Sequence, residues 1–332
     1  MKDILIIATG GTIASRRGKN GLSPVIDANE LVSYVPKIAE LCNISCLSPF
    51  SLDSTNIRPV DWLKLADIIK RNYDKYDGFV ICHGTDTMAY TSAALSYLIQ
   101  NSYKPIVITG AQRPIDMEIT DAKTNLIDSV VFALQDKAHG VCMVFDGKVI
   151  CATRAKKQRT KSYNAFSSVN YPNIARIIDE RVVFYIDDKC EEQPVFYDSL
   201  EPGVFLLKLI PGIDAEFINY IASKYKGLII ESFGLGGLPD YNGDKKIAAA
   251  IKKFTEGGGI VVISTQVPNE GSDMTVYEVG SSVKNGLKII EAYDMTTEAA
   301  VTKLMWLLGN FSDYSEIESN FYREINHDIL MA

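Results

Sequence analysis

The sequence contains little that would point to a metal site, a membrane protein or a nucleic-acid binder. Its three histidines are too scattered to suggest a metal cluster. No apolar stretch approaches the roughly 20 residues that a transmembrane helix needs. Acidic residues outnumber lysine and arginine, giving a net charge of −7, whereas a nucleic-acid binder needs a basic face to neutralise phosphates. We therefore expect no metal, no membrane and no nucleic acid as partner.

Cysteines are also few and show no pairing signal. None of the six belongs to a CxxC motif. Cys82, Cys142 and Cys151 lie within strand-like apolar runs, where a free thiol behaves as a small hydrophobic side chain. The first apolar run, Ile4–Ile7, comes too early to leave room for a signal peptide. The sequence therefore predicts a cytoplasmic protein with reduced cysteines.

The first half of the chain alternates strand-like and helical segments. The apolar runs typical of buried strands are Ile4–Ile7, Phe79–Cys82, Ile106–Thr109 and Val141–Phe145. Between them, Pro59–Tyr73 and Asp121–Gln135 carry apolar residues at helical spacing. Helices alternating with near-continuous apolar strands predict a doubly wound parallel sheet. The dipeptide Asp146-Gly147 indicates a hairpin, so we expect antiparallel strands near 148–153.

The length and apolar content of the chain predict two α/β domains. Acidic residues and two prolines interrupt the alternation between Asp187 and Gly203. Beyond them, apolar runs such as Leu228–Ile230 and Ile260–Ser264 predict a second, smaller α/β unit. The predicted ranges are 1–190 for the N-terminal domain, 191–208 for the linker and 209–332 for the C-terminal domain.

Two threonine-containing segments directly follow predicted buried strands. Ala8–Ala14 reads ATGGTIA, and His83–Met88 reads HGTDTM. Each places a hydroxyl at the carboxyl end of a parallel strand, where open α/β sheets bind ligands. Glycines before Thr12 permit a sharp turn and leave amide groups unobstructed. Two threonines, a carboxylate and free amide donors indicate acyl transfer through a hydroxyl nucleophile.

Both segments also have a purely structural interpretation. Thr12 could only shape a turn, and Thr85 or Asp86 could cap the helix that starts there, although Thr-Asp-Thr supplies more polar groups than one cap needs. His83 is interpreted as a hydrogen-bonded structural residue. The glycines match neither GxGxxG nor the Gly-Lys-Ser/Thr pattern, which disfavours a phosphate site.

Two further segments could complete such a site. Lys157 follows the apolar run that ends at Cys151, and such lysines are usually solvated. Paired with Thr85 and Asp86, however, it could relay a proton. Asp53-Ser54-Thr55-Asn56 suits a turn and helix entry. It would equally suit the recognition of an α-amino and α-carboxylate pair.

These residues resemble the bacterial-type L-asparaginases, the threonine-dependent asparaginase/glutaminase family. The resemblance rests on TGGTIAS at Thr9–Ser15, HGTDTMAYT at His83–Thr91 and TGAQRP at Thr109–Pro114, and extends over essentially the whole chain. It implies hydrolysis of L-asparagine to L-aspartate and ammonia without a cofactor. The form of Asp53-Ser54-Thr55 is more similar to the cytoplasmic type I enzymes than to the periplasmic type II ones.

The resemblance also implies catalytic roles and an assembly. Thr12 would be the nucleophile that forms an acyl-enzyme, and Thr85, Asp86 and Lys157 would activate water or shuttle the proton. Members of the family pair subunits so that each site borrows from the neighbour's C-terminal domain. The resemblance thus implies a homodimer or homotetramer with shared active sites.

Substrate contacts follow from the same motifs. Ser54 and Thr55, with Thr85 and Asp86, would hold the α-groups of the substrate, and Ala111 would contact its amide through the backbone. With the neighbouring aspartate included, the predicted substrate-binding residues are Asp53, Ser54, Thr55, Thr85, Asp86 and Ala111.

Two positions depart from the family pattern. Leu22 stands where many members carry a tyrosine in the mobile loop after the first threonine, and we expect another tyrosine to replace it. The glycines and charges of Arg16–Gly21 are typical of a lid that closes over a site. Glu231 stands where some type I enzymes use an arginine to bind asparagine at a separate allosteric site. A carboxylate cannot bind the ligand carboxylate as arginine would, which predicts little or no cooperativity.

Other functions stay open from the sequence. One alternative is a glutaminase, or the glutamyl-tRNA amidotransferase component that releases ammonia, which resembles this family but carries an extra N-terminal domain. Another is a catalytically silent amino-acid-binding protein, for which Leu22 is the only support. The preference between asparagine and glutamine depends on roughly one methylene of pocket depth, worth only about 1–3 kcal/mol.

Overall fold

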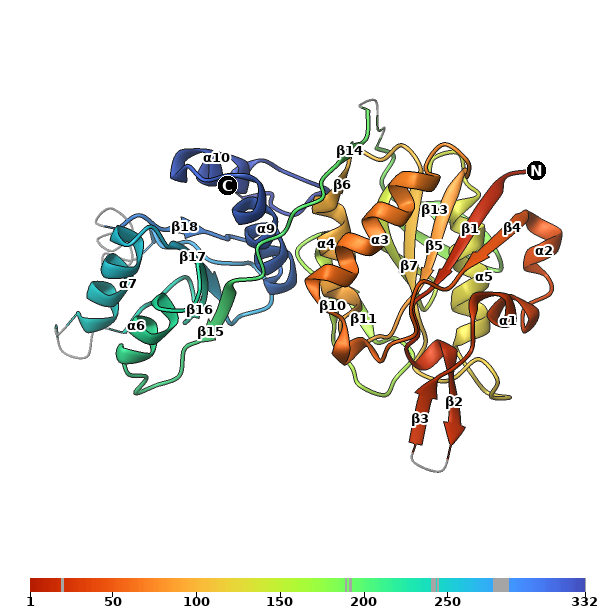
Figure 1. Ribbon diagram of the computed structural model, residues 1–332, viewed down its shortest axis with the longest axis horizontal. Coiled ribbons are helices and arrows are strands. Elements are labelled where there is room, and N and C mark those ends of the chain that lie inside the picture. Colours follow the sequence, from red (N-terminus) through yellow and green to blue (C-terminus); the bar gives the residue numbers. More distant parts are fainter. Residues whose placement is uncertain are drawn as a thin grey trace. The chain divides into compact units, whose positions relative to one another are not determined.

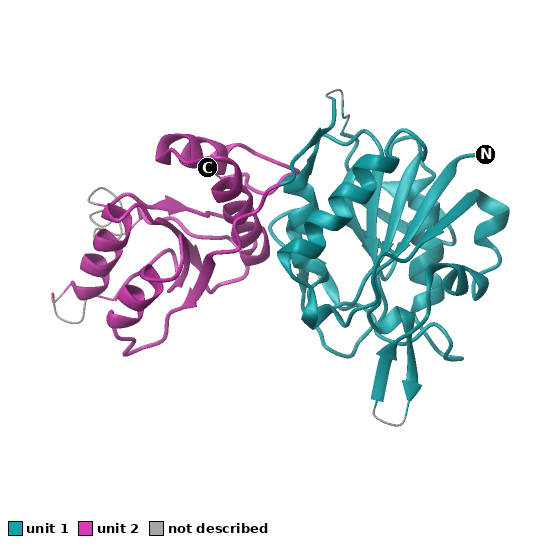
Figure 2. Ribbon diagram, in the orientation of Figure 1, with its two compact units in different colours: residues 1–198 teal, residues 199–332 magenta. Residues whose placement is uncertain are grey.

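The chain forms two compact units, Met1–Asp198 and Ser199–Ala332 (Figure 2). The computed structural model describes residues 1–18, 21–188, 190, 193–239, 243, 245–276 and 287–331. The boundary between the units falls inside the predicted linker, 191–208. The strand β15 (Val204–Lys208) of that segment belongs to the sheet of the second unit. The second unit therefore includes residues before position 209.

An eight-stranded sheet forms the centre of the first unit, in the order β13-β12-β9-β8-β7-β5-β1-β4 (Figure 1). Its strands are β1 (Asp3–Ala8), β4 (Asn43–Leu47), β5 (Gly78–Cys82), β7 (Pro105–Thr109), β8 (Gly140–Phe145), β9 (Lys148–Cys151), β12 (Ala175–Ile178) and β13 (Arg181–Phe184). From β4 to β8 all neighbours are parallel. The β8–β9 hairpin at Asp146-Gly147 starts an antiparallel edge, as the sequence predicts.

Helices cover both faces of this sheet. They are α1 (Ala28–Ser33), α2 (Ile38–Leu41), α3 (Pro59–Asn72), α4 (Met88–Leu98) and α5 (Ala122–Ala133). The first two and α5 share a core with Val80, Val107 and Val144 of the sheet. The helices α3 and α4 lie on the opposite face (Figure 1). The predicted doubly wound α/β architecture is therefore confirmed.

The strand order of the first sheet reverses beside β1. Along the parallel part of the sheet the order is β4-β1-β5-β7-β8. After β1, the chain places β4 on one side of β1, and then β5, β7 and β8 on the other side. In open α/β sheets, ligands bind at the carboxyl ends of the strands where the order reverses in this way. Here that point lies between β1 and β5, the strands that precede the two threonine segments.

Smaller elements connect these layers. Short 3₁₀ helices are η1 (Thr12–Ala14), η2 (Ser54–Asn56) and η3 (Ala152–Arg154). Paired strands outside the main sheet are β2 (Ser15–Gly18) with β3 (Gly21–Pro24), β10 (Ala155–Lys157) with β11 (Phe166–Ser168), and β6 (Ile99–Gln100) with β14 (Val195–Phe196). The thiols of Cys82, Cys142 and Cys151 are reduced and buried, as predicted.

The second unit is built on a parallel sheet in the order β15-β16-β17-β18. Its other elements are β16 (Gly227–Ser232), β17 (Ile260–Thr265), β18 (Ile290–Glu291), α6 (Glu216–Ala222), α7 (Lys246–Glu256), α9 (Thr297–Asn310) and α10 (Tyr314–Tyr322). Ile218 of α6 and Ile251 of α7 pack into one core with the sheet. Thr296 caps α9 by accepting a hydrogen bond from the Ala299 N–H at 3.1 Å. Within the described ranges, no helix has the length and apolar character needed to cross a bilayer.

Candidate active site

Glycines bring three loops into contact at the carboxyl ends of β1 and β5. The Gly11 N–H donates to the carbonyl oxygen of Leu52 at 2.8 Å. A Cβ atom at Gly11 would lie 2.2 Å from the Gly84 Cα, and one at Gly84 would lie 2.6 Å from the Ser54 Oγ. Only glycine fits at either position, because any side chain would collide with the neighbouring loop. The loops that carry Thr12, Ser54 and Thr85 are thus held directly against one another.

Thr12 is presented with its hydroxyl and N–H unused. It is half-buried and is the first residue of η1, directly after Gly10 and Gly11, whose φ angles of +105° and +73° suit glycine. Neither its hydroxyl nor its N–H bonds to any part of the chain that the structure describes. A hydroxyl with an adjacent free N–H, set on a tight turn, can both attack a carbonyl and bind the resulting oxyanion.

Lys157 joins the Thr85 and Asp86 side chains, although these residues are far apart in the sequence. Its Nζ donates to the Thr85 Oγ1 at 2.8 Å and to the Asp86 Oδ1 at 2.6 Å. Thr85 is buried, whereas 58% of the Asp86 side chain is exposed. Neither residue caps the following helix, since the N-cap of α4 is Thr87 and no side-chain cap bond forms. The structural interpretation of Thr85 and Asp86 as caps was therefore wrong.

The segment 53–55 lies against this group. The Ser54 Oγ accepts a hydrogen bond from the Asp86 N–H at 3.2 Å, and the Thr87 hydroxyl donates to the Ser54 carbonyl oxygen at 2.8 Å. The Asp53 Oδ1 accepts from both the N–H and the hydroxyl of Thr55, each at 2.9 Å. Asp53 therefore acts as the N-cap of η2, and its contact with a substrate stays a prediction, as do those of Ser54 and Thr55.

The loop after β7 adds two residues that sequence reasoning missed. The Thr85 hydroxyl donates to the Gln112 Oε1 at 3.3 Å. The carboxylate of Asp121 accepts from the N–H groups of Gln112 and Arg113 at 2.9–3.1 Å. An aspartate at a helix start normally suggests a cap, but Asp121 makes no cap bond with α5 and holds this loop instead. Ala111 is fully buried, so its backbone contact with a substrate stays a prediction.

His83, the first residue of the second threonine segment, is fixed by hydrogen bonds at both nitrogens of its ring. Its Nδ1 lies 2.7 Å from the Gly84 carbonyl oxygen, which can only accept, so Nδ1 carries the proton. Its Nε2 then accepts from the Thr91 hydroxyl at 3.0 Å, and that oxygen accepts from the Trp62 indole at 2.9 Å. Complete burial lowers the pKa of His83 to about 4, which keeps the ring neutral. The prediction of a hydrogen-bonded structural histidine is confirmed.

The structure describes both positions that depart from the family pattern, Leu22 and Glu231. Leu22 lies on β3, opposite Arg17 of β2, and 51% of it is exposed. The predicted lid, Arg16–Gly21, thus includes strand residues of this hairpin, while Lys19 and Asn20 lie outside the described residues. The replacement of Leu22 by another tyrosine stays a prediction. Glu231, at the end of β16, accepts a hydrogen bond from the Thr297 hydroxyl at 2.7 Å.

Across the part of the chain that the structure describes, no three histidine, cysteine, aspartate or glutamate residues are placed to hold a metal ion.

Known proteins resemble the chain along its whole length. The family model for the asparaginase N-terminal domain matches residues 3–189, and the glutaminase/asparaginase C-terminal domain matches residues 203–321. The L-asparaginase of Thermococcus kodakarensis is 36% identical over 328 residues, which are 98% of each chain. Its solved structure covers 99% of this chain and all of its own, with a TM-score of 0.92.

Two other relatives bear on the choice of function. A component of the glutamyl-tRNA(Gln) amidotransferase of Pyrococcus horikoshii is 35% identical over 96% of this chain and 74% of its own. The solved structure of a probable cytoplasmic L-asparaginase from Campylobacter jejuni matches with a TM-score of 0.83 and 28% identity, covering 98% of this chain and all of that one. Both domain models match in order, and the Thr12 hydroxyl lies where the strand order of the sheet reverses. The chain therefore belongs to the asparaginase family of amidohydrolases.

Proposed function

We propose that the protein is an L-asparaginase that hydrolyses L-asparagine to L-aspartate and ammonia, with Thr12 as nucleophile. The observation that carries the proposal is the free Thr12 hydroxyl on a loop packed against a Lys157-linked Thr85–Asp86 pair. A hydroxyl nucleophile needs a group that removes its proton, and Lys157 in its neutral amine form would take that proton through the Thr85 hydroxyl. The similarity to the Thermococcus kodakarensis L-asparaginase over the full length of both chains supports the choice of substrate.

The reaction would proceed in two acyl-transfer steps. The Thr12 Oγ1 attacks the side-chain amide carbon, and the Thr12 N–H stabilises the oxyanion. The C–N bond then breaks, ammonia leaves with the proton that the hydroxyl gave up, and an ester with Thr12 remains. Water attacks this ester and releases L-aspartate with a regenerated hydroxyl. Thr85 and Lys157 provide the route for the proton in each step.

Substrate recognition would use the polar groups around Asp86. Its carboxylate is largely exposed and would pair with the α-ammonium group of an amino acid. Ser54 accepts the Asp86 N–H through its Oγ, which leaves its hydroxyl hydrogen to donate to the α-carboxylate. The two residues are adjacent through the hydrogen bond from the Asp86 N–H to the Ser54 Oγ, as a substrate with adjacent positive and negative charges requires.

A second candidate function is ammonia release from glutamine as part of an amidotransferase. The similarity to the Pyrococcus horikoshii amidotransferase component favours it, although this chain spans 74% of that relative. We further propose a cytoplasmic location, on the similarity to the Campylobacter jejuni protein.

A homodimer or homotetramer with shared active sites is likewise proposed. The second unit exposes Ile210, Phe217 and Tyr220, each with more than half of its surface accessible, and such apolar side chains are typical of protein–protein contacts. Light scattering coupled to gel filtration checks this, and a monomer at micromolar concentration would contradict it.

Ammonia release from L-asparagine and L-glutamine tests the proposed function. We expect wild-type activity on asparagine, and for Thr12→Ala a loss in kcat of at least about 10³-fold. Thr255→Ala serves as a matched control, because its hydroxyl bonds the Lys252 carbonyl within its own helix. Activity on glutamine alone would favour the amidotransferase function. No ammonia from either amide would overturn the proposal in favour of a silent binding protein.

A further inference from the structure

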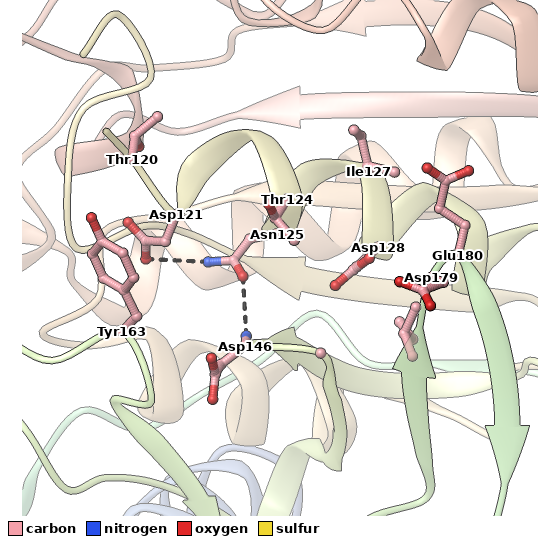
Figure 3. Close-up of a pocket in the computed structure, with 12 residues that line it drawn as sticks. Thr120, Asp121, Thr124, Asn125, Ile127, Asp128, Asp146, Tyr163, Asp179 and Glu180 are labelled. Carbon is pink, nitrogen blue, oxygen red and sulfur yellow. Dashed lines mark hydrogen bonds between the residues drawn. The ribbon is translucent and has the colours of Figure 1, made fainter. Parts of the chain in front are cut away.

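A cavity of about 500 Å³ lies on the α5 face of the first sheet (Figure 3). Its walls come from α5, from the β8–β9 turn at Asp146-Gly147, from the β12–β13 turn at Asp179-Glu180, and from Tyr163. This volume is within the range of small-molecule sites, about 300–1,000 Å³. The cavity adjoins the candidate active site at Asp121, which holds the loop of Gln112. Its lining includes none of the proposed catalytic residues Thr12, Thr85, Asp86 and Lys157.

The charged residues that line the cavity are all acidic: Asp121, Asp128, Asp146, Asp179 and Glu180. Some of these carboxylates have partners. Asp121 accepts backbone N–H groups, Asp146 lies 3.4 Å from the Lys148 Nζ, and Glu180 forms an ion pair with Lys37. Asp128 and Asp179 form no hydrogen bond and no ion pair among the residues that the structure describes, although the positive charge of Arg176 acts on Asp128 and lowers its pKa.

Asp128 points from α5 into the cavity and is 6% exposed (Figure 3). Its carboxylate forms neither a hydrogen bond nor an ion pair within the described ranges. Burial, together with the nearby Glu180 and Asp146 carboxylates, raises its pKa to about 6, while Arg176 opposes the shift. A carboxylate of low exposure that lies near two other carboxylates and makes no hydrogen bond is unfavourable, and a cation entering the cavity would reduce this penalty.

The chemistry of the walls distinguishes between kinds of cation. A metal ion needs several converging oxygen ligands, and the described residues include no group of three acidic, histidine or cysteine side chains placed to hold one. The remaining walls include the side chains of Ile127 and Ile177 and the ring of Tyr163. Such surfaces fit an alkyl chain better than the water shell of a metal ion.

We propose that this cavity binds a small organic amine, with Asp128 pairing with its ammonium group and Asp179 contributing charge from the neighbouring turn. The amine is then an unreactive ligand, and its binding does not depend on the asparaginase reaction. A straight diamine such as 1,4-diaminobutane has the required charge and an alkyl body, so it is a suitable probe.

Calorimetric titration with 1,4-diaminobutane at about pH 7.5, where Asp128 is ionised, tests the proposal. We expect saturable binding to the wild type and an affinity lower by about 30-fold or more for Asp128→Asn. Asp74→Asn is the matched control, because Asp74 is an exposed carboxylate beyond the end of α3, on the opposite face of the sheet. It should bind the diamine as the wild type does.

Two further ligands test whether the charge or the shape of the diamine governs its binding. 1,4-Butanediol has the same length without charge and should not bind, and MgCl₂ should not compete with the diamine at equal ionic strength. Binding of Mg²⁺ in place of the diamine, equal affinity for Asp128→Asn, or no diamine binding up to about 10 mM would each overturn the proposal.

A measurement on the wild type keeps the proposal testable if Asp128→Asn fails to fold. The diamine must compete with the proton for the Asp128 carboxylate, so its affinity should rise between pH 5 and pH 7. The groups that face this carboxylate are Glu180, Asp146 and Arg176. Asp179→Asn is a change on an exposed turn. It should lower the affinity for the diamine by a smaller factor than the factor by which the affinity rises between pH 5 and pH 7. A flat pH dependence would contradict the role of Asp128.

Discussion

At the level of single residues, the group around Lys157 is the most sharply defined part of the site. Its ammonium group bridges a buried hydroxyl and an exposed carboxylate within 2.8 Å. Because the lysine lies on the short strand β10, its neighbour Lys156 projects to the opposite side of the strand. The chain thus offers the proposed catalytic lysine and a matched control at adjacent positions.

We expect Lys157→Met to lower kcat by about 10²–10⁴-fold, because the proton loses its route through Thr85. The KM for asparagine should change much less, since Lys157 is not among the residues predicted to bind the α-groups. Steady-state ammonia release checks both values, with Lys156→Met expected to stay near the wild type. Equal losses in the two variants would mean that positive charge on β10, and not the bridge, is what matters.

Among the secondary-structure elements, the contact between the loops after β1 and β5 depends on Gly11. Its φ of +73° disfavours other residues, and a Cβ there would lie 2.3 Å from the Gly84 nitrogen. Gly21 has a φ of +119° but nothing within 4 Å of its added Cβ. An alanine at either position would therefore adopt a strained backbone conformation. Only the alanine at position 11 would also collide with a neighbouring loop.

Gly11→Ala is expected to lower the free energy of unfolding by about 3–5 kcal/mol, since strain and collision act together. Gly21→Ala should lower it by about 1–2 kcal/mol, the effect of strain alone. Urea unfolding followed by circular dichroism measures both values. If the two substitutions had the same effect, the close approach of the loops would not be what requires Gly11.

The helix α9 is fixed by an ion pair that has no exposure to water. The Lys303 Nζ lies 2.6 Å from the Asp328 Oδ2, and both side chains are fully buried. The same Nζ donates to the Arg323 carbonyl oxygen at 2.8 Å, and Asp328 accepts the Ile325 N–H at 2.9 Å. Burial lowers the pKa of Lys303, and the Asp328 charge counteracts this effect. The pair therefore attaches the C-terminal segment to α9.

Asp328→Asn should destabilise the second unit by about 3–5 kcal/mol, because it leaves a buried ammonium group without a counter-charge. Glu256→Gln is the control, since its pair with Lys252 spans 3.8 Å on the surface and should contribute about 0–1 kcal/mol. Thermal unfolding of both variants at one protein concentration checks the difference. A small change for Asp328→Asn would mean that Lys303 stays satisfied without Asp328.

For the molecule as a whole, two buried groups, His83 and Asp128, contribute to the dependence of stability on pH with opposite signs. The pKa of His83 is lowered to about 4, so its contribution to stability is present above its unfolded pKa, near 6.5, and is lost as the pH falls toward 4. The pKa of Asp128 is raised to about 6, so the native state holds its proton more tightly than the unfolded chain. Ionisation of Asp128 therefore lowers stability as the pH rises from about 4 to 6.

Asp128→Asn separates the two effects. It should raise the free energy of unfolding by about 1–3 kcal/mol above pH 7 and leave it unchanged below pH 4, where wild-type Asp128 is protonated. Urea unfolding across this pH range measures the difference, with Asp74→Asn as the exposed control. A gain that is the same at every pH would show that the unpaired charge is not its cause.

Local patterns in the sequence predicted the main strands and helices of both units, but not smaller elements such as β4, β12 and β13. Apolar runs and helical spacing identified the strands and helices because burial in a layered fold leaves a local pattern. The bounds agree within a few residues, as for α3 at Pro59–Asn72. The partnership of Lys157 with Thr85 and Asp86 was also predicted, because a hydroxyl nucleophile requires a route for its proton.

The meeting of distant residues, in contrast, is visible only in the folded chain. Gln112 accepts the Thr85 hydroxyl, and Asp121 accepts backbone N–H groups of the loop after β7 as well as the Asn125 side chain of its own helix. Asp128 was hidden inside a helical pattern, and its cavity forms only when α5, the β8–β9 turn and the β12–β13 turn come together. A helix or strand is recorded in short-range periodicity, whereas a contact between loops depends on strand order and register, which no local window of sequence contains.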